Sequence, residues 1–204
     1  MPQGQPGCVP DDGLTSRERR LRPALIVNTG DGKGKTTAAM GLALRAWHQG
    51  WSTGVFQFVK SGTWVTGERL ALAALDAEHR RTGTGGPIEF FATGSGRRWV
   101  RRSDAEPDQS DAARAAWDEV ALRLGEERHQ LYVLDEFTYP LAWGWLDLTE
   151  VVSALRERPG TQHVVITGRN APPELLDLAT TVTEMHPLKH PFEDGQKGQA
   201  GIEW

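Results

Sequence analysis

The chain has 204 residues, a mass of 22.5 kDa and a net charge of −4, and 38% of its residues are hydrophobic. This length suits one domain with a sizeable core, and the negative charge argues against a general nucleic-acid or anionic-membrane binder. The single cysteine, Cys8, excludes an internal disulfide and fits a reducing compartment. Because the sequence has no membrane-length apolar run and no apolar secretory signal, we expect a cytoplasmic protein that does not enter a membrane.

The N-terminal segment differs in composition from the rest. Residues 1 to about 15 are rich in glycine and proline, which predicts a mobile tail. A basic run follows, with arginines at positions 17, 19, 20 and 22. We expect this run to be a solvated lead-in to the first strand, and a functional arm is the alternative. The predicted division is a flexible arm over residues 1–22 and one domain over residues 23–204.

An apolar strand, a glycine-rich turn and a helix follow one another over residues 25–46. The turn contains Gly34-Lys35-Thr36, which fits the end of the phosphate-loop pattern GxxxxGK[ST], whereas Thr29 stands at the pattern's first glycine. In such a loop, backbone N–H groups and the helix N-terminus surround phosphates, and Lys and Thr supply a charge and a Mg²⁺ ligand. A chance glycine-rich turn is the alternative, which the flanking strand and helix disfavour. The sequence therefore predicts a nucleotide-binding loop.

Apolar runs alternate with helical periodicity through the rest of the domain. Strands are predicted at residues 53–59, 88–91, 131–134, 163–167 and 182–185, and helices at residues 110–125, 151–155 and 172–178. A polar loop containing Lys60, Trp64, Gly67, Glu68 and Arg69 is predicted after the second strand. This alternation predicts three α/β layers around a mostly parallel sheet, with the ligand at the carboxyl ends of the strands.

Charged residues follow two of the buried strands. Asp135 and Glu136 come directly after residues 131–134, where a carboxylate could complete a Mg²⁺ site with Thr36 or cap the next turn. The phosphate loop favours the metal site. Arg169 follows residues 163–167 on the same edge of the predicted sheet, where its guanidinium could reach a phosphate.

Several short motifs occur once each along the chain, and their order is informative. They are the loop 29–37, the segments 57–60, 67–69, 134–139 and 166–169, and the tail segments 189–192 and 201–204. With these motifs the chain resembles the P-loop ATP:corrinoid adenosyltransferases, the cob(I)yrinic acid a,c-diamide adenosyltransferases of cobalamin biosynthesis, over residues 23–204. The resemblance implies a three-layer P-loop NTPase (RecA-like) fold.

The resemblance also implies a reaction. The Co(I) of a corrinoid would attack the ribose C5′ of ATP and expel triphosphate, in cobalamin biosynthesis or salvage, so that no protein nucleophile is needed. Lys33 and Lys35 would stabilise the leaving group. The ATP-binding residues that the resemblance implies are Gly30, Asp31, Gly32, Lys33, Gly34, Lys35, Thr36, Thr37, Arg45 and Arg169. Thr36 and Glu136 would bind Mg²⁺ (or Mn²⁺), and Asp135 would have a structural role.

The corrinoid site and the partners are further implications of the resemblance. Aromatic residues of a Gly-x-x-Trp loop would face the corrin, and the matching segment here keeps Trp99 but has Arg97 where an aromatic residue is expected. Arg97 would then meet a corrin carboxylate or point outward, with Phe91 or Trp64 supplying the apolar contact. Glu68 and Arg69 are either substrate contacts or a surface ion pair.

The family is also expected to form a homodimer, in which residues 15–22 of one subunit cover the other's site. An electron donor such as a reduced flavin or a flavoprotein would produce Co(I).

Three other functions fit parts of the sequence. Residues 97–102 interleave arginines with Trp99, as in a single-strand-binding loop, which would suit a nucleic-acid-dependent ATPase. The net acidity weighs against this alternative. A small-molecule kinase would use the same loop but release ADP. A non-catalytic nucleotide-binding protein would have no need for Lys35, Thr36 and Glu136.

Overall fold

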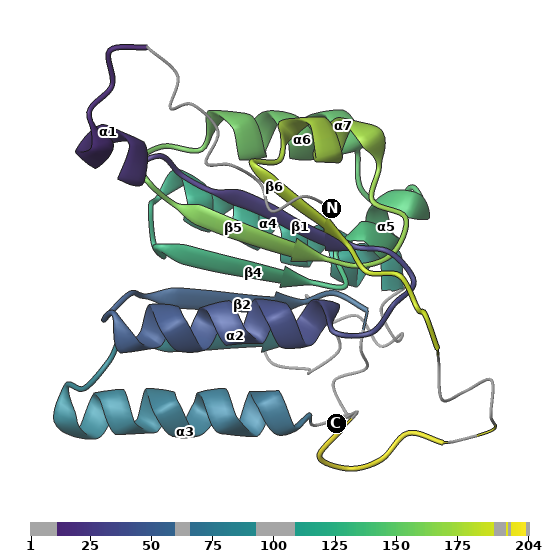
Figure 1. Cartoon of the computed structure of the whole chain (residues 1–204), viewed down its shortest axis with the longest axis horizontal. Coiled ribbons are helices and arrows are strands. Elements are labelled where there is room, and N and C mark those ends of the chain that lie inside the picture. The colour runs from purple at the N-terminus through teal and green to yellow at the C-terminus, as the bar shows by residue number, and fades with distance from the viewer. Residues whose placement is uncertain (1–11, 60–65, 93–108, 190–194, 196, 203–204) are drawn as a thin grey trace.

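The computed structural model describes residues 12–59, 66–92, 109–189, 195 and 197–202. Six strands form one sheet in the order β3-β2-β4-β5-β1-β6, and every pairing is parallel (Figure 1). Their bounds are β1 Leu25–Thr29, β2 Thr53–Gln57, β3 Ile88–Ala92, β4 Leu131–Asp135, β5 His163–Thr167 and β6 Thr181–Glu184. Because β5 lies between β1 and β4, the strand before the phosphate loop and the strand that ends in Asp135 are not adjacent.

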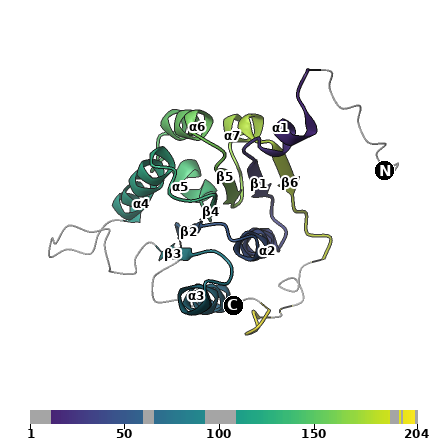
Figure 2. The ribbon, with the colours of Figure 1, turned by 90° about the vertical axis from the view of Figure 1, so that its left-hand side faces the viewer.

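Helices cover both faces of the sheet (Figure 2). One face carries α2 (Lys35–His48) and α3 (Gly67–Thr82). The other carries α4 (Gln109–Gly125), α5 (Thr138–Ala142), α6 (Leu148–Glu157) and α7 (Pro173–Leu178). This arrangement confirms the predicted three-layer P-loop NTPase fold. Within the described ranges, no helix has both the length and the apolar character needed to cross a bilayer.

Each central strand contributes to two apolar clusters, one on each face of the sheet. In β4, Tyr132 and Leu134 belong to the cluster under α4–α7, whereas Leu131 and Val133 belong to the cluster under α2 and α3. Successive side chains of a strand point to opposite faces, so a strand with helices on both sides is apolar throughout. All five residues of β4 are accordingly buried.

The largest difference from the sequence prediction is α3. The prediction of a polar loop was wrong for Gly67, Glu68 and Arg69, which form the first turn of this helix. The helix begins where the Thr66 side chain accepts a hydrogen bond from the Arg69 N–H over 3.4 Å, with an acidic residue in the first turn. Leu72 is the only fully buried apolar residue of the helix among those described, and the half-buried Leu75 packs beside it, so the apolar periodicity is weak. The short helix α5 was also not predicted.

The basic segment before the sheet contains a short helix, α1 (Ser16–Arg20). Thr15 caps it, because its hydroxyl accepts the Glu18 N–H while the Glu18 carboxylate accepts the Thr15 N–H. Asp12 forms ion pairs with Arg19 and Arg22. The helix has no buried residues. The division of the chain at residue 22 stays a prediction.

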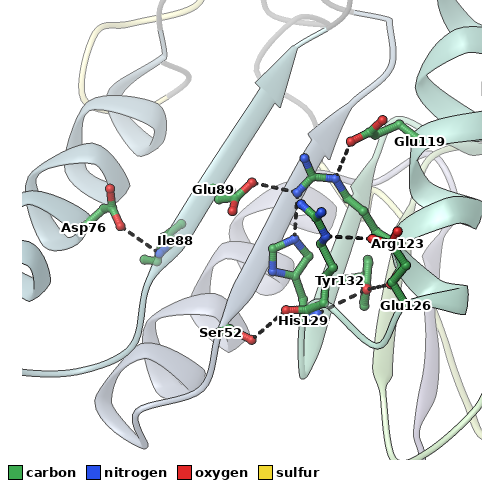
Figure 3. A network of polar contacts seen from close by, with 10 residues as sticks. Ser52, Asp76, Ile88, Glu89, Glu119, Arg123, Glu126, His129 and Tyr132 are labelled. Atoms are coloured by element: carbon green, nitrogen blue, oxygen red, sulfur yellow. Dashed lines mark hydrogen bonds and ion pairs between the residues drawn. The ribbon is translucent and has the colours of Figure 1, made fainter.

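A network of polar contacts joins the edge strand β3 to α4 (Figure 3). The guanidinium of Arg123 lies 2.6 Å from both Glu89 on β3 and Glu119 on α4, and its Cζ lies 4.4 Å from the centroid of the Phe91 ring. Arg123 also contacts Nε2 of His129 at 3.2 Å. Burial lowers the pKa of His129 to about 4, so the imidazole is neutral and Nε2 accepts from the guanidinium. The network therefore links β3, whose last residue lies at the carboxyl edge of the sheet, to α4.

Candidate functional site

The phosphate loop, residues 30–34, connects β1 to α2 at the carboxyl edge of the sheet. The loop curves around the Lys35 ammonium, which donates to the carbonyl oxygens of Gly30 and Gly32 over 2.6 Å each. Burial lowers the pKa of Lys35, and nearby Arg169 acts in the same direction, whereas Glu136 and Asp31 oppose the shift. The cationic side chains of Lys35 and Arg169 thus lie near the loop and the N-terminus of α2. Phosphates bind favourably in this electrostatic environment.

The glycines of the loop face a residue that the sequence patterns did not indicate. A Cβ added to Gly30 or Gly32 would lie 2.6 or 2.7 Å from the carbonyl oxygen of Met185, just beyond β6. The Gly32 N–H donates to that same oxygen over 2.6 Å. The expectation that the glycines serve phosphate binding is therefore incomplete, because close packing on Met185 also requires them. No motif pointed to Met185, whose contact runs through its backbone.

Thr36 and Asp135 are in direct contact. The Thr36 hydroxyl donates to Asp135 Oδ1 over 2.7 Å, and the Thr167 hydroxyl donates to the same oxygen over 2.7 Å. Gln57 Nε2 donates to Asp135 Oδ2 over 2.9 Å, and the Asp135 carboxylate is fully buried. The ends of β2, β4 and β5 thereby hold one carboxylate against the first turn of α2. Sequence reasoning gave Asp135 a structural role, and the structure adds this direct bond to the phosphate-loop threonine.

Glu136 has an unusual backbone conformation. Its φ is 59°, in the left-handed region that costs a non-glycine residue about 1–2 kcal/mol. Its N–H donates to the Thr167 hydroxyl over 3.0 Å. The Glu136 carboxylate raises the pKa of Tyr139, after the larger effect of burial, and it opposes the lowering of the Lys35 pKa. Glu136 therefore lies within electrostatic reach of the phosphate loop, and strain of this kind concentrates at functional sites.

Arg169 lies beside the phosphate loop, in the segment between β5 and α7. Its Nη1 is 3.6 Å from the Asp31 carboxylate, and about half of its side chain is exposed. The preceding Gly168 has φ 142°, and a Cβ there would lie 2.1 Å from the Thr138 hydroxyl. That hydroxyl donates to the Arg169 carbonyl oxygen over 2.6 Å. The predicted placement of Arg169 on the carboxyl edge is therefore what the structure shows.

Arg45 is not brought to the phosphate loop. It lies in the last turn of α2, a 14-residue helix about 21 Å long that begins at Lys35. Together with Trp51 and His163 it lines a mostly apolar pocket of about 220 Å³ near the starts of β4 and β5. Its assignment as an ATP contact stays a prediction from the resemblance. Lys33 and Thr37 are exposed at the loop and in the first turn of α2.

Residues expected to contact the corrinoid fall into two groups. Trp64, Arg97 and Trp99 lie outside the described residues. Glu68 and Arg69 belong to the first turn of α3, and the Arg69 guanidinium lies 5.6 Å from the centroid of the Phe90 ring on β3.

Phe91, the alternative apolar contact, stacks on Phe56 with 4.7 Å between ring centroids. It therefore packs within the fold.

The side chains at the carboxyl edge offer oxygen donors suited to a divalent cation. They are the Thr36 hydroxyl and the carboxylates of Asp135 and Glu136, and hard oxygen ligands fit Mg²⁺ or Mn²⁺. Among the residues that the structure describes, no group of three or more His, Cys, Asp or Glu side chains is arranged to hold a metal ion. A cation at this edge would consequently draw further ligands from phosphate oxygens and water, as Mg²⁺ commonly does.

Comparison with known proteins identifies the family. A sequence model of the family described as ATP:corrinoid adenosyltransferase BtuR/CobO/CobP matches residues 22–204. The chain is 42% identical to corrinoid adenosyltransferase CobA of Salmonella typhimurium over 193 residues, which cover 95% of this chain and 91% of that protein. It is 40% identical to a corrinoid adenosyltransferase of Escherichia coli K12 (95% and 91% covered) and 36% identical to one of Pseudomonas aeruginosa (95% and 89% covered). The chain therefore belongs to the ATP:corrinoid adenosyltransferase family.

Proposed function

We propose that the protein transfers the 5′-deoxyadenosyl group of ATP to the Co(I) of a corrinoid and releases triphosphate. Family membership supports ATP and a corrinoid as the substrates of an adenosyltransferase in cobalamin metabolism. The observation that best supports the proposal is the phosphate loop, in which the Thr36 hydroxyl donates a hydrogen bond to the buried Asp135 of β4. A loop built in this way binds the polyphosphate of a nucleotide.

The phosphate loop would stabilise a leaving group in this reaction. The electron pair of Co(I) forms the bond to C5′, the C5′–O bond breaks, and triphosphate leaves with the electron pair of that bond. Negative charge would therefore grow on the triphosphate, next to Lys33, Lys35, Arg169 and the N–H groups of residues 33–36. Preorganised cations and dipoles at that position lower the barrier electrostatically, and no protein nucleophile takes part.

The metal ligands are also part of the proposal. Thr36 and Glu136 would hold Mg²⁺ or Mn²⁺, which neutralises phosphate charge when bound. Because the Thr36 hydroxyl donates its hydrogen to Asp135, its lone pairs remain for a cation. Asp135 would thus orient the threonine ligand, and the strained backbone at Glu136 would keep the second ligand beside Lys35.

The corrinoid and its reduction are finer parts of the proposal. The corrinoid would be cobyrinic acid a,c-diamide or cobalamin, and its contacts would be Trp64, Glu68, Arg69, Arg97 and Trp99. One electron from a reduced flavin or a flavoprotein would convert Co(II) to Co(I) before the transfer. We infer that this chemistry takes place in the cytoplasm.

A homodimer with an N-terminal arm completes the proposal. The exposed helix α1 carries three arginines, a surface suited to an acidic partner or substrate. Residues 15–22 of one subunit would cover the site of the other. Deletion of residues 1–22 should lower the adenosylation rate while light scattering still reports a dimer. An unchanged rate after the deletion would remove the arm from the account.

Replacement of Lys35 by alanine tests the proposed site. Lys35→Ala removes the ammonium at the centre of the loop, so the KM for ATP should rise at least about tenfold and turnover should fall. Arg156→Ala is the matched control, because Arg156 is exposed on α6 and its loss changes the net charge equally. Adenosylation by the Lys35 variant at the rate of the unaltered protein would overturn the assignment of the phosphate site.

A further inference from the structure

We propose that Met185 is a positioning residue of the ATP site, whose backbone carbonyl sets the phosphate loop and, through Gly32, the Lys35 ammonium. The proposal rests on the proposed function only in that ATP must bind this loop. It adds the end of the C-terminal strand to the nucleotide site. Met185 directly follows the edge strand β6 and contacts the loop through its backbone.

The backbone of Met185 bridges β1 and the middle of the loop. Its N–H donates to the carbonyl oxygen of Thr29, the last residue of β1, over 2.9 Å. Its carbonyl oxygen accepts the Gly32 N–H over 2.6 Å. Since both bonds come from one peptide segment, the position of Gly32 relative to the end of β1 is fixed by residue 185.

Three alternate glycines of the loop face this one residue. A Cβ on Gly30 would lie 2.6 Å from the Met185 oxygen and 2.8 Å from its nitrogen, and a Cβ on Gly32 would lie 2.7 Å from the oxygen. A Cβ on Gly34 would lie 3.5 Å from the Met185 sulfur. Gly30 and Gly34 additionally have φ values of 90° and 106°. The loop can therefore approach the Met185 backbone this closely only because Gly30 and Gly32 lack side chains, whereas Gly34 is required by its backbone conformation.

The contact extends to the lysine that would meet the phosphates. The carbonyl oxygen of Gly32 accepts a hydrogen bond from Lys35 Nζ over 2.6 Å. Gly32 therefore links Met185, through its N–H, to the Lys35 ammonium, through its carbonyl oxygen. The Gly32 N–H donates to Met185 and would therefore not be available to a phosphate. A shift of Met185 would therefore move both the loop and the cation.

The placement of Met185 depends in turn on β6. This strand lies at the edge of the sheet, pairs with β1 in the register Thr29↔Glu184, and has four exposed residues. β6 packs only slightly against the core. Its position therefore depends on the hydrogen bonds to β1 and on the hydrogen bond between Gly32 and Met185. ATP binding to an ordered loop would then also hold the C-terminal strand in place.

Amide hydrogen exchange followed by NMR tests the contact without relying on turnover. In the full chain without ATP, the Gly32 amide should already be protected, and ATP should change its exchange little. The amides of residues 33–36 should gain protection when ATP is added, because they face the phosphates. A Gly32 amide that exchanges freely until ATP is added would overturn the proposal.

Two substitutions test the consequence for ATP binding. Gly32→Ala should weaken ATP binding, measured by calorimetry without corrinoid, at least about tenfold, because the new Cβ displaces Met185. Gly41→Ala, on α2 with open space around its Cβ, is the matched control and should bind ATP normally.

The outcomes separate this proposal from the proposed function. Wild-type ATP affinity in a folded Gly32→Ala variant, with its near-ultraviolet circular dichroism unchanged, would overturn the positioning role. The KM for the corrinoid should stay unchanged in that variant, and an equal rise in both KM values would contradict a role confined to the phosphate loop. ATP binding without adenosyl transfer by the unaltered protein would contradict the proposed function and leave the role of Met185 standing.

Discussion

The Thr36 hydroxyl and the Asp135 carboxylate are joined by a 2.7 Å hydrogen bond across 99 residues of sequence. The same carboxylate oxygen accepts from Thr167, and the other accepts from Gln57. One buried carboxylate therefore joins the start of α2 to the ends of three neighbouring strands. The packing of the sheet edge and the proposed phosphate site therefore share one side chain.

Replacement of Asp135 by asparagine should weaken both properties. The asparagine NH₂ group would face a donor that now binds the Asp135 carboxylate. This leaves a buried polar group unsatisfied and should lower the free energy of unfolding by about 2 kcal/mol. ATP affinity should fall about tenfold because Thr36 loses its fixed orientation. Urea unfolding and calorimetry measure the two effects. Asp177→Asn, an exposed change on α7, should alter neither.

Relief of the backbone strain at Glu136 should separate stability from activity. Glu136→Gly removes the cost of the left-handed conformation and should keep or raise the free energy of unfolding, by up to about 1 kcal/mol. It also removes the proposed metal ligand, so adenosylation should fall strongly. Glu127→Gly is the control, since Glu127 also has a positive φ but is exposed after α4. If Glu136→Gly retained full turnover, Glu136 would not be a metal ligand.

Loss of the Arg169 charge should affect ATP more than the corrinoid. Arg169→Gln should raise the KM for ATP about tenfold at low salt, because the guanidinium lies beside Asp31 and the phosphate loop. The difference should shrink as salt screens the half-exposed charge. Initial rates at two salt concentrations provide the measurement, with Arg156→Gln as the control. A KM for ATP that does not change would exclude Arg169 from the nucleotide site.

The buried His129 should make stability depend on pH in the acid range. Its pKa is about 4 in the folded protein and 6.5 in the unfolded chain, so the unfolded chain binds more protons between these values. Stability should thus be complete above pH 6.5 and fall by up to about 3 kcal/mol as the pH is lowered to about 4.

Unfolding curves at several pH values test this, and His129→Gln should flatten the profile. The slope that remains would come from other groups, including His163, whose pKa is also lowered by burial. His48→Gln, at an exposed position on α2, is the control. An unchanged acid profile in the His129 variant would contradict a neutral buried imidazole.

Much of the architecture could be predicted because both faces of the sheet are covered. Strands such as β4 and β5 are apolar at successive positions, and the helices between them have helical periodicity, so their order indicated a parallel sheet. The helix α3 could not be recognised in this way, because Leu72 and Asp76 are its only buried residues among those described. Its start is marked by the Thr66 cap, which is a weaker pattern than an apolar stripe.

The site was partly predictable for a related reason. Lys35, Thr36 and Arg169 follow strands whose carboxyl ends meet at one edge, so their chain positions indicated where they lie. Met185 acts through its backbone, which any residue possesses, so its identity carried no pattern. The bonds from Gln57 and Thr167 to Asp135 depend on strand order, which spacing along the chain does not reveal.

The identity of the phosphate product tests the central claim most directly. The purified protein would be incubated without oxygen with Mg²⁺-ATP and chemically reduced cob(I)alamin or cobyrinic acid a,c-diamide, while the corrin spectrum is followed. We predict one intact triphosphate for each adenosylcorrinoid formed. ADP as the product, or ATP binding without any adenosylcorrinoid, would contradict adenosyl transfer by this phosphate loop.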